Sequence, residues 1–369
     1  MRRGAARAWL AVVAGCGVGC SLFTDLGGFD EGEGVTTQPT PDAGADAPGA
    51  EDAPGDAEVD AGGYRPRYQG RFSITNNASV AMPASFPVCA YGLKALDLVT
   101  AGKLRADFGD LRIFGATGER RRVIDVRAGG VTVTCFRTDR PIAPGGKDEG
   151  YVVRYGDPNM APPPPAEVDV FTFWDGFDGT SLSAKWLTFG APKVAGGVLT
   201  LPAGEHGVTT VAALDGVPLA ASLELRVKVA DPDSDPVPRD GGTFYYWFGF
   251  QHKGDFEASQ PWSIFVARGK GQIHAEHKTV SGSCEPGCGD VYYPQRTDFR
   301  VYRIDRTEAA VGFLYDDGKA WIAEGSNGDE SIMIRNWLAA SELQVDWVRA
   351  RPIVEPAPTI SAAEEEVLY

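Results

Sequence analysis

The stretch FWDGFDGTSLSAKW, residues 173–186, opens the longer of two series of short alternating segments in this chain. In ASLELRVKV (221–229), Leu223, Leu225 and Val227 alternate with Glu224 and Arg226. Successive side chains of a strand point to opposite sides, so this alternation predicts a strand with one buried face. Further segments of this kind follow: TFYYWFGFQ, WSIFVARG, QIHAEHKTV, FRVYRID, AVGFLYDDGKAWIA and LQVDWVRARP. We therefore expect an antiparallel jelly roll over residues 173–353.

The region before this stretch also predicts strands. RFSITN, DLRIF, RVIDV, VTVTCF and YVVRY are short, rich in β-branched and aromatic residues, and separated by turn residues. The proline run APPPPAEVD (161–169) breaks the pattern and marks a boundary. The expected fold class is all-β, with a first sandwich over 64–161, a proline-rich linker over 162–172 and a second sandwich after it.

Both parts resemble known families of exported proteins. FGDLRIFGATGERRRVIDV followed by GYVVRYGDPNMA resembles the DUF2341 family of bacterial exported proteins over about residues 68–161. The matching residues are Asp110, Leu111, Arg112, Phe114, Tyr155, Gly156, Asp157 and Pro158. Relatives usually have a Trp-containing strand where this chain has VTVTCF, and the resemblance implies a module without a known activity. DGFDGTSLSAKW, GGVLTL and VDWVRARP resemble the concanavalin A-like sandwiches, which include polysaccharide hydrolases and domains that only bind.

The N-terminus predicts export. Three arginines among the first seven residues precede an apolar run that ends in small residues, which is typical of a secretory signal over residues 1–19. The signal resembles that of bacterial lipoproteins, in which a cysteine receives the lipid. Cys20 is the expected site, because an even number of cysteines then remains, and Cys16 is the alternative. The resemblance implies lipid anchoring in the bacterial cell envelope, at the outer membrane or the cell surface.

The acidity of the chain is concentrated outside the expected sandwiches. The formal net charge is −15, and residues 21–63 contain eleven acidic side chains and no basic one. Such a segment buries too little apolar surface to offset its ordering entropy, so we expect a disordered linker over 20–63. Residues 354–369 are expected to form a disordered tail. The sandwiches themselves are nearly neutral, so we expect no binding to nucleic acid. The expected oligomeric state is a monomer.

Catalytic patterns are weak. Laminarinase-like members of the concanavalin A-like fold have their acids in the string E-x-D-x-x-E on one strand face, and this string is absent. Glu167-x-Asp169 and Asp255-x-Glu257 are isolated pairs. In HAEH, His274 and His277 would face opposite sides of a strand and could not share a metal ion. We therefore expect no catalytic residue.

Two features of the sequence suggest disulfide bonds and a calcium site. Cys89 with Cys135, and Cys284 with Cys288, lie within the two expected sandwiches, and we expect both pairs to form disulfides in an oxidising compartment. In DPDSDPVPRDG, spaced carboxylates resemble a loop that wraps calcium, although a plain acidic connection is the alternative. The four acids are Asp231, Asp233, Asp235 and Asp240. No other cofactor is expected.

The aromatic segment TFYYWFGFQH (243–252) supplies the ligand-binding hypothesis. Tyr245, Trp247 and Gln251 share one face of the expected strand, and His252 follows. Aromatic rings beside amide and imidazole groups suit a saccharide, although sandwich cores also use such rings. We expect an envelope protein that binds polysaccharide without catalysis. The alternatives are a divergent glycan hydrolase and a structural envelope protein.

Overall fold

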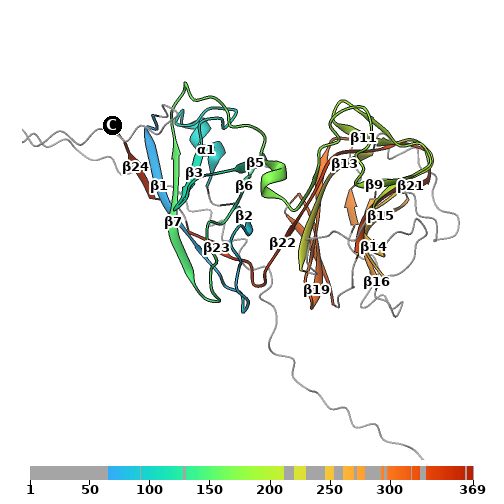
Figure 1. Ribbon diagram of the computed structural model, residues 1–369. Helices are drawn as coiled ribbons and strands as arrows, with labels where there is room; N and C mark the ends of the chain where they lie inside the picture. The colour runs from blue at the N-terminus through green and yellow to red at the C-terminus, as the bar shows by residue number, and fades with distance from the viewer. Residues whose placement is uncertain are drawn as a thin grey trace, which may run out of the picture. The chain divides into compact units, whose positions relative to one another are not determined.

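The computed structural model describes residues 65–368, apart from 92, 128–129, 212–219, 230–245, 253–260, 270–271, 279–291, 295–296, 317, 325–329 and 362–363. The described chain is nearly all β, as expected, and forms two sandwiches (Figure 1). Its two helices are short: α1 (Ala95–Thr100) and α2 (Glu167–Val170). No helix in this part of the chain is long and apolar enough to cross a membrane.

The first sandwich consists of two antiparallel sheets. One has the order β23-β1-β7-β3-β4, with β24 also paired to β1, and the other has the order β2-β6-β5. The strands are β1 (Tyr68–Thr75), β2 (Pro87–Ala90), β3 (Arg112–Gly115), β4 (Gly118–Arg120), β5 (Arg122–Val126), β6 (Thr132–Arg137), β7 (Lys147–Tyr155), β23 (Thr359–Ile360) and β24 (Glu364–Val367). Phe72, Phe136 and Tyr151 pack together at the centre of its core.

The second sandwich consists of two larger sheets. The eight-stranded sheet has the order β10-β11-β22-β13-β18-β19-β20, with β8 paired to β22. The seven-stranded sheet has the order β17-β16-β15-β14-β21-β12-β9. The strands of the first are β8 (Phe173–Asp175), β10 (Lys193–Ala195), β11 (Val198–Leu201), β13 (Ala221–Val229), β18 (Arg300–Arg306), β19 (Ala310–Tyr315), β20 (Lys319–Glu324) and β22 (Leu343–Pro352). Those of the second are β9 (Trp186–Phe189), β12 (Gly204–Thr210), β14 (Tyr246–His252), β15 (Trp262–Gly269), β16 (Gln272–Lys278), β17 (Tyr292–Pro294) and β21 (Glu330–Ala339).

An aromatic core joins these two sheets. Phe248 and Phe265 from the seven-stranded sheet pack against Tyr302 and Phe313 from the eight-stranded sheet, and all four are buried. Edge-to-face contacts of this kind add to the hydrophobic gain from burying the rings. The core therefore accounts for one face of each sheet, as the alternating sequence predicts.

The opening stretch folds around one carboxylate. Asp175 accepts hydrogen bonds from the backbone N–H of Phe177 (2.8 Å), from Ser183 Oγ (2.9 Å) and from Trp186 Nε1 (2.7 Å). These bonds close the DGFDGTSLSAKW turn and place the ring of Trp186 in the core. The described contacts of Asp175 in this stretch thus stabilise the fold.

The C-terminal tail is not disordered, contrary to expectation. β23 and β24 pair antiparallel with β1, so that Ile74 lies opposite Ile360 and Tyr68 opposite Val367. The tail supplies backbone groups to an otherwise open strand edge, which is why a segment of low hydrophobicity becomes ordered. Side chains reinforce the pairing, because Tyr155 donates a hydrogen bond to Glu365 (2.6 Å).

Cys89 and Cys135 form a disulfide, as expected. They lie directly opposite each other on β2 and β6. The bridge packs in a small core that also contains Val170 of α2 and Phe171. The proline-rich linker therefore ends in residues that are buried against the first sandwich.

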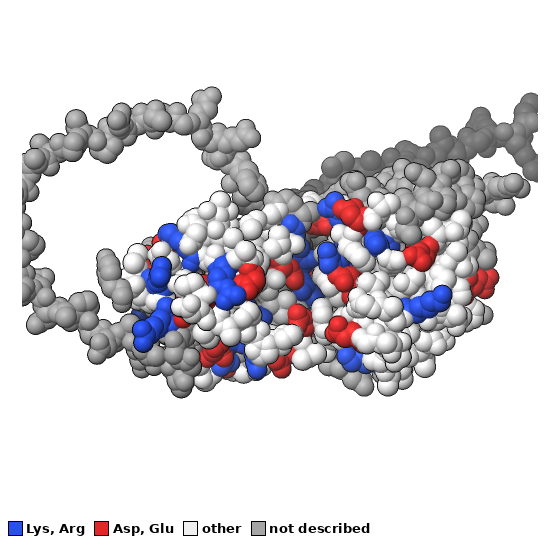
Figure 2. Space-filling model, turned by 90° about the horizontal axis from the view of Figure 1, so that it is seen from above, with Lys and Arg blue, Asp and Glu red and all other residues white. Residues whose placement is uncertain are grey.

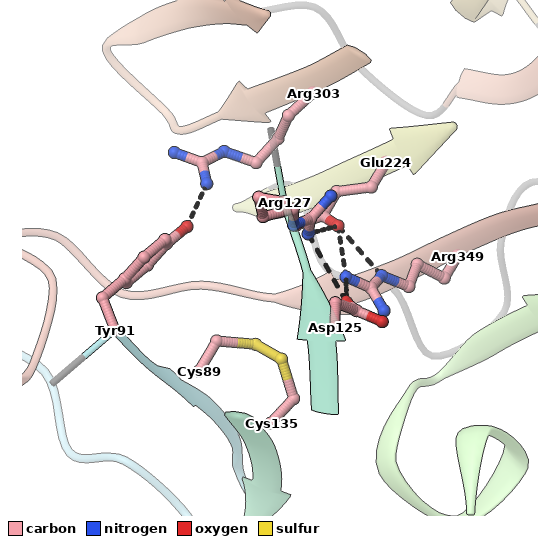
Figure 3. Close-up of a disulfide and its surroundings, with 8 residues drawn as sticks. All are labelled: Cys89, Tyr91, Asp125, Arg127, Cys135, Glu224, Arg303 and Arg349. Carbon is pink, nitrogen blue, oxygen red and sulfur yellow. Dashed lines mark hydrogen bonds and ion pairs between the residues drawn. A yellow bond between two sulfur atoms is a disulfide. The ribbon is translucent and has the colours of Figure 1, made fainter. Parts of the chain in front are cut away.

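A buried ion cluster connects the two sandwiches (Figure 3). Glu224 of β13 accepts hydrogen bonds from Arg127, which follows β5 (2.6 Å), and from Arg349 of β22 (2.6 and 2.9 Å). Arg349 also donates to Asp125 of β5 (2.5 Å). Burial alone would raise the pKa of Glu224, but the surrounding arginine charges hold that pKa well below its ordinary value. The carboxylate is therefore ionised at neutral pH.

Candidate functional site

The face of the seven-stranded sheet that points away from the core carries the candidate site. Tyr246, Phe248 and Phe250 of β14 point into the core, so Trp247 and Gln251 point the other way. Cross-strand register extends this outer face: Trp247 lies opposite Val266 and Arg335, and Gln251 lies opposite Trp262 and Ser331. The outer face is defined here by side chains of β9, β12, β14, β15, β16 and β21.

Aromatic rings and a guanidinium group meet on this face. The rings of Trp247 and Trp337 are nearly parallel, with centroids 6.5 Å apart. Cζ of Arg335 lies 3.7 Å from the centroid of Trp337 and 5.0 Å from that of Trp247. The ring of Phe189 is 5.6 Å from the same carbon. The cation is thus held among three aromatic side chains.

A carboxylate and an amine lie on the other side of the outer face. Glu276 of β16 is 1% exposed, and its Oε1 is 3.7 Å from Nζ of Lys278. The same Nζ lies 4.6 Å from the ring centroid of Trp262. Of the buried carboxylates that the structure describes, Glu276 is the one on the seven-stranded sheet.

Part of the outer face is accessible at its edge. Leu187 and Phe189 of edge strand β9 are 43% and 37% exposed, and Val211, just after β12, is 49% exposed. Trp337 is half-buried, whereas Trp247 and Trp262 are buried. The outer face therefore offers an exposed apolar strip that continues into buried tryptophans.

Gly249 lies in the middle of β14, where a side chain would be crowded against the core of the sandwich. It lies between Ile264 and Met333 in register and has a φ of +147°. A Cβ built there would approach the backbone oxygen of Ser263 to 2.5 Å and Cδ1 of Ile304 to 2.7 Å. Only glycine fits this conformation and this space, so neither side of the sheet has a side chain at this position.

The predicted ligand-binding residues are partly brought together. Trp247 and Gln251 share the outer face and are buried. Tyr245 and the side chain of His252 lie outside what the structure describes. Sequence reasoning missed Trp262, Glu276, Lys278, Arg335 and Trp337, because they lie on three other strands and only the sheet register joins them to Trp247.

The predicted ion and lipid sites lie outside the described residues. This applies to the acids of the calcium loop, Asp231, Asp233, Asp235 and Asp240, to Cys284 and Cys288, and to Cys16 and Cys20. Among the residues that are described, no group of three or more His, Cys, Asp or Glu side chains is placed to hold a metal ion.

The two histidines of HAEH do face opposite sides. His274 lies opposite Val266 on the outer face, whereas His277 lies opposite Ser263 on the core side. Nδ1 of His277 is 3.1 Å from Oγ of Ser263, and the imidazole is 1% exposed. Burial lowers the pKa of His277, partly offset by a backbone hydrogen bond at Trp262.

The residues that carry the DUF2341 resemblance tie loops together. Asp110 accepts hydrogen bonds from the backbone N–H groups of Arg105 (3.0 Å) and Gly156 (3.0 Å). Arg112 donates to the carbonyl oxygens of Gly109 (2.5 Å) and Ala161 (2.7 Å). Satisfying buried backbone groups is a structural task, and it explains this residue pattern without chemistry.

Charged side chains on the described surface are mixed. In Figure 2, Lys and Arg are interspersed with Asp and Glu over the face that is shown. Ion pairs of the described chain include Arg300 with Asp298 (2.6 Å) and Arg120 with Asp139 (2.6 Å). Cations also lie over aromatic rings elsewhere in the described chain, as Arg349 does over Phe171 and Trp347.

Comparisons with solved structures found similarity to several glycan-cleaving enzymes. An endo-acting O-glycanase of the human gut microbiota, which initiates mucin breakdown, is 20% identical, with a TM-score of 0.39, over 50% of this chain and 99% of its own. The laminarinase from Rhodothermus marinus is 16% identical, with a TM-score of 0.39, over 50% and 98%. A β-1,3-1,4-glucanase from a mouse hindgut metagenome is 16% identical, with a TM-score of 0.37, over 49% and 99%. The shared feature is the concanavalin A-like jelly roll.

No protein-family model and no curated protein matches the chain. The resemblance of the first sandwich to DUF2341 therefore stays a prediction. The prediction that the chain is not an enzyme is contradicted, because the similar structures are glycanases. That prediction depended on the missing E-x-D-x-x-E string, and a missing string excludes only enzymes that carry both acids on one strand.

Proposed function

We propose that this protein is a divergent glycan hydrolase that binds and cleaves polysaccharide at the outer face of the seven-stranded sheet. One observation carries the proposal: Trp247, Trp262, Gln251 and Glu276 share that face. The accessible rings at the edge of that face, Phe189 and Trp337, can stack on a sugar. The amide can hydrogen-bond hydroxyl groups, and a buried carboxylate can act on a glycosidic bond.

Glu276 is the proposed catalytic carboxylate. Glycoside hydrolysis ordinarily needs two carboxyl groups, one as acid and one as base or nucleophile. No second buried carboxylate lies on this sheet among the described residues. The sequence pair Asp255 and Glu257 lies outside them, so amide variants of both acids belong in the same experiment.

The test is an assay for new reducing ends with the purified protein on laminarin, lichenan, mucin glycans and alginate. We expect turnover of at least one substrate. Glu276→Gln should abolish turnover and retain binding, whereas Trp337→Ala should weaken both, because stacking on one ring contributes about 1 kcal/mol. Glu308→Gln, an exposed acid of the same sandwich, is the control. Binding without turnover in the wild type would refute hydrolysis.

We also propose that the protein is anchored to the bacterial envelope through a lipid on Cys20. Cys20→Ala should abolish labelling with a radioactive fatty acid and release the protein, because each buried methylene of the acyl chains contributes about 0.8 kcal/mol to anchoring. Labelling that survives in this variant and disappears in Cys16→Ala would move the lipid to the other cysteine.

A further inference from the structure

Charge is divided unevenly between the two sandwiches. Residues 64–161 contain fifteen Lys and Arg against nine Asp and Glu, whereas residues 162–353 contain seventeen against twenty-six. The small net charge of the two together therefore results from a positive first sandwich and a negative second sandwich. A positive excess attracts an anionic partner where its cations are accessible and are not already paired with carboxylates.

Three arginines of the first sandwich lie on the side of its six-stranded sheet that points away from the core. Strands β1 and β7 are neighbours in this sheet (Figure 1). Phe72 of β1 and Val153 of β7 are buried in the core, so Arg71 and Arg154 point the other way. Arg67 continues the outward series of β1, because its backbone N–H still donates to a carbonyl oxygen of β7 (3.0 Å). These three side chains are called the arginine face.

Strand register sets the spacing of the arginine face. Arg154 lies directly opposite Gln69, which is midway between Arg67 and Arg71 on β1. Arg154 is therefore a diagonal neighbour of both arginines, and such neighbours on adjacent strands are about 7–8 Å apart. Four residues of extended chain separate Arg67 from Arg71, a length of about 13 Å. The three cations thus form a row that follows the direction of β1.

The cations of the arginine face are accessible and are not neutralised by described residues. Arg67 and Arg71 are exposed, and Arg154 is half-buried. The described part of the chain contains no ion-pair partner for any of the three. Cζ of Arg154 lies 4.9 Å from the ring centroid of half-buried Phe114, a contact that orients the guanidinium group and leaves its charge in place. Nε of Arg154 is buried without a hydrogen-bond partner among the described residues.

Carboxylates lie at both margins of the arginine face. On one side, β24 pairs with β1 and brings Glu364 and Glu366 alongside it. Glu366 accepts a hydrogen bond from the amide of Gln69 (2.8 Å). On the other side, Glu119 of β4 forms an ion pair with Arg112 (3.1 Å). The accessible positive surface is therefore bounded by acids, and an anionic ligand would be repelled at the β24 side.

From this geometry we infer that the arginine face is a second, non-catalytic site that binds an anionic polysaccharide. Guanidinium groups form charge-assisted, bidentate hydrogen bonds with carboxylate and sulfate groups. A row of three cations along an extended strand suits a linear chain with charges on successive sugars better than a single small anion.

The chemistry of the face favours a polysaccharide over single-stranded nucleic acid. Sheets that bind single strands stack bases on accessible aromatic rings, whereas the ring of Phe114 beside this face already stacks with Arg154. The choice of a polysaccharide also rests on the proposed function, which assigns glycan cleavage to the second sandwich. The arginine face would hold an anionic glycan independently of that reaction.

The experiment measures binding of the full-length protein to alginate, carrageenan and neutral laminarin by isothermal titration calorimetry. We expect alginate or carrageenan to bind, and added NaCl to weaken that binding because salt screens charge pairs. Arg67→Gln and Arg71→Gln should each weaken it about tenfold and leave laminarin binding unchanged. Glu366→Gln should strengthen it about threefold, because a charge of the same sign as the ligand is removed. Arg121→Gln, which removes an exposed arginine between β4 and β5, is the matched control and should have no effect.

The outcomes separate this inference from the proposed function. No binding of either anionic glycan, or binding that persists when Arg67, Arg71 and Arg154 are all changed to Gln, would overturn the inference. Tighter binding of single-stranded DNA or of phosphatidylglycerol vesicles than of either anionic glycan would also overturn it. Turnover is measured separately: hydrolysis that survives in the triple variant preserves the proposed function when this inference fails. Arginine-dependent binding without turnover of any glycan preserves this inference when the proposed function fails.

Discussion

At the scale of single residues, His277 makes the stability of the second sandwich depend on pH. Burial lowers the pKa of this imidazole, so the folded state favours the neutral form more than the unfolded state does. Stability from this group is complete above the unfolded pKa of about 6.5 and is lost as pH falls toward the folded pKa.

We expect the free energy of unfolding to decrease as pH falls from 7.5 to 5.5. Urea titrations at several pH values measure this change. His277→Gln should flatten the dependence, and His274→Gln, on the opposite face, should keep it. A wild-type profile that is flat over this range would contradict the assignment.

Gly249 is the second residue with a distinct prediction. Gly249→Ala combines a strained φ with contacts below 3 Å, so we expect a loss of about 3 kcal/mol or more in unfolding free energy. Gly118, with a φ of +118° and nothing within 4 Å of a built Cβ, isolates the backbone strain. Gly118→Ala should cost about 1 kcal/mol. Equal losses in the two variants, measured by thermal melts, would show that crowding at Gly249 is unimportant.

At the scale of secondary structure elements, the C-terminal strands complete the first sandwich. Ser361 accepts a hydrogen bond from the backbone N–H of Ser73 (2.8 Å), and Asn77 donates to Thr359 (2.7 Å). Lys103 forms an ion pair with Glu365. They add to the backbone pairing of β23 and β24 with residues 68–71, 74 and 75 of β1.

Ending the chain at residue 353 should therefore expose the edge of β1. We expect a lower melting temperature for the first sandwich and faster amide exchange along β1, followed by mass spectrometry, because the removed backbone partners are replaced by water. The single change Val367→Lys, at a half-exposed position, should leave exchange unchanged. Unaltered exchange in the truncated chain would show that β23 and β24 contribute no protection.

Strand patterns could be predicted at this scale, but strand partners could not. The alternation in ASLELRVKV correctly separates Leu223 and Leu225 from Glu224, yet it suggests that Glu224 meets water. Glu224 is buried because Arg127, 97 residues away, lies against it. The same limit applies to the candidate site. That Trp247 and Gln251 share one strand face can be predicted from their spacing. That Glu276 and Arg335 lie on the same face depends on how the strands pair across the sheet.

At the scale of the whole molecule, the ion cluster around Glu224 couples the two sandwiches. Glu224→Gln would leave the buried guanidinium groups of Arg127 and Arg349 without their shared carboxylate. Breaking a buried pair in this way costs about 3–5 kcal/mol, whereas replacing the set with apolar residues restores much of the loss. The low pKa of Glu224 means that its contribution is complete above about pH 4.5 and is lost as pH falls further.

Calorimetry should show one unfolding transition for the wild type and two for Glu224→Gln. The double variant Glu224→Leu with Arg349→Met should regain stability relative to Glu224→Gln. Two separate transitions in the wild type would mean that the cluster does not couple the sandwiches.

The return of the C-terminal strands to β1 has a consequence for biogenesis. The backbone N–H of Leu368 donates to the carbonyl oxygen of Arg67 (2.7 Å). This pairing cannot form until residue 368 has been synthesised, long after residue 67. The second sandwich contains all of its strands between residues 173 and 352 and can fold before β23 and β24 emerge. During synthesis, the sandwich that emerges first is thus the one that finishes last, and until then its β1 edge is open to chaperones or to neighbouring chains.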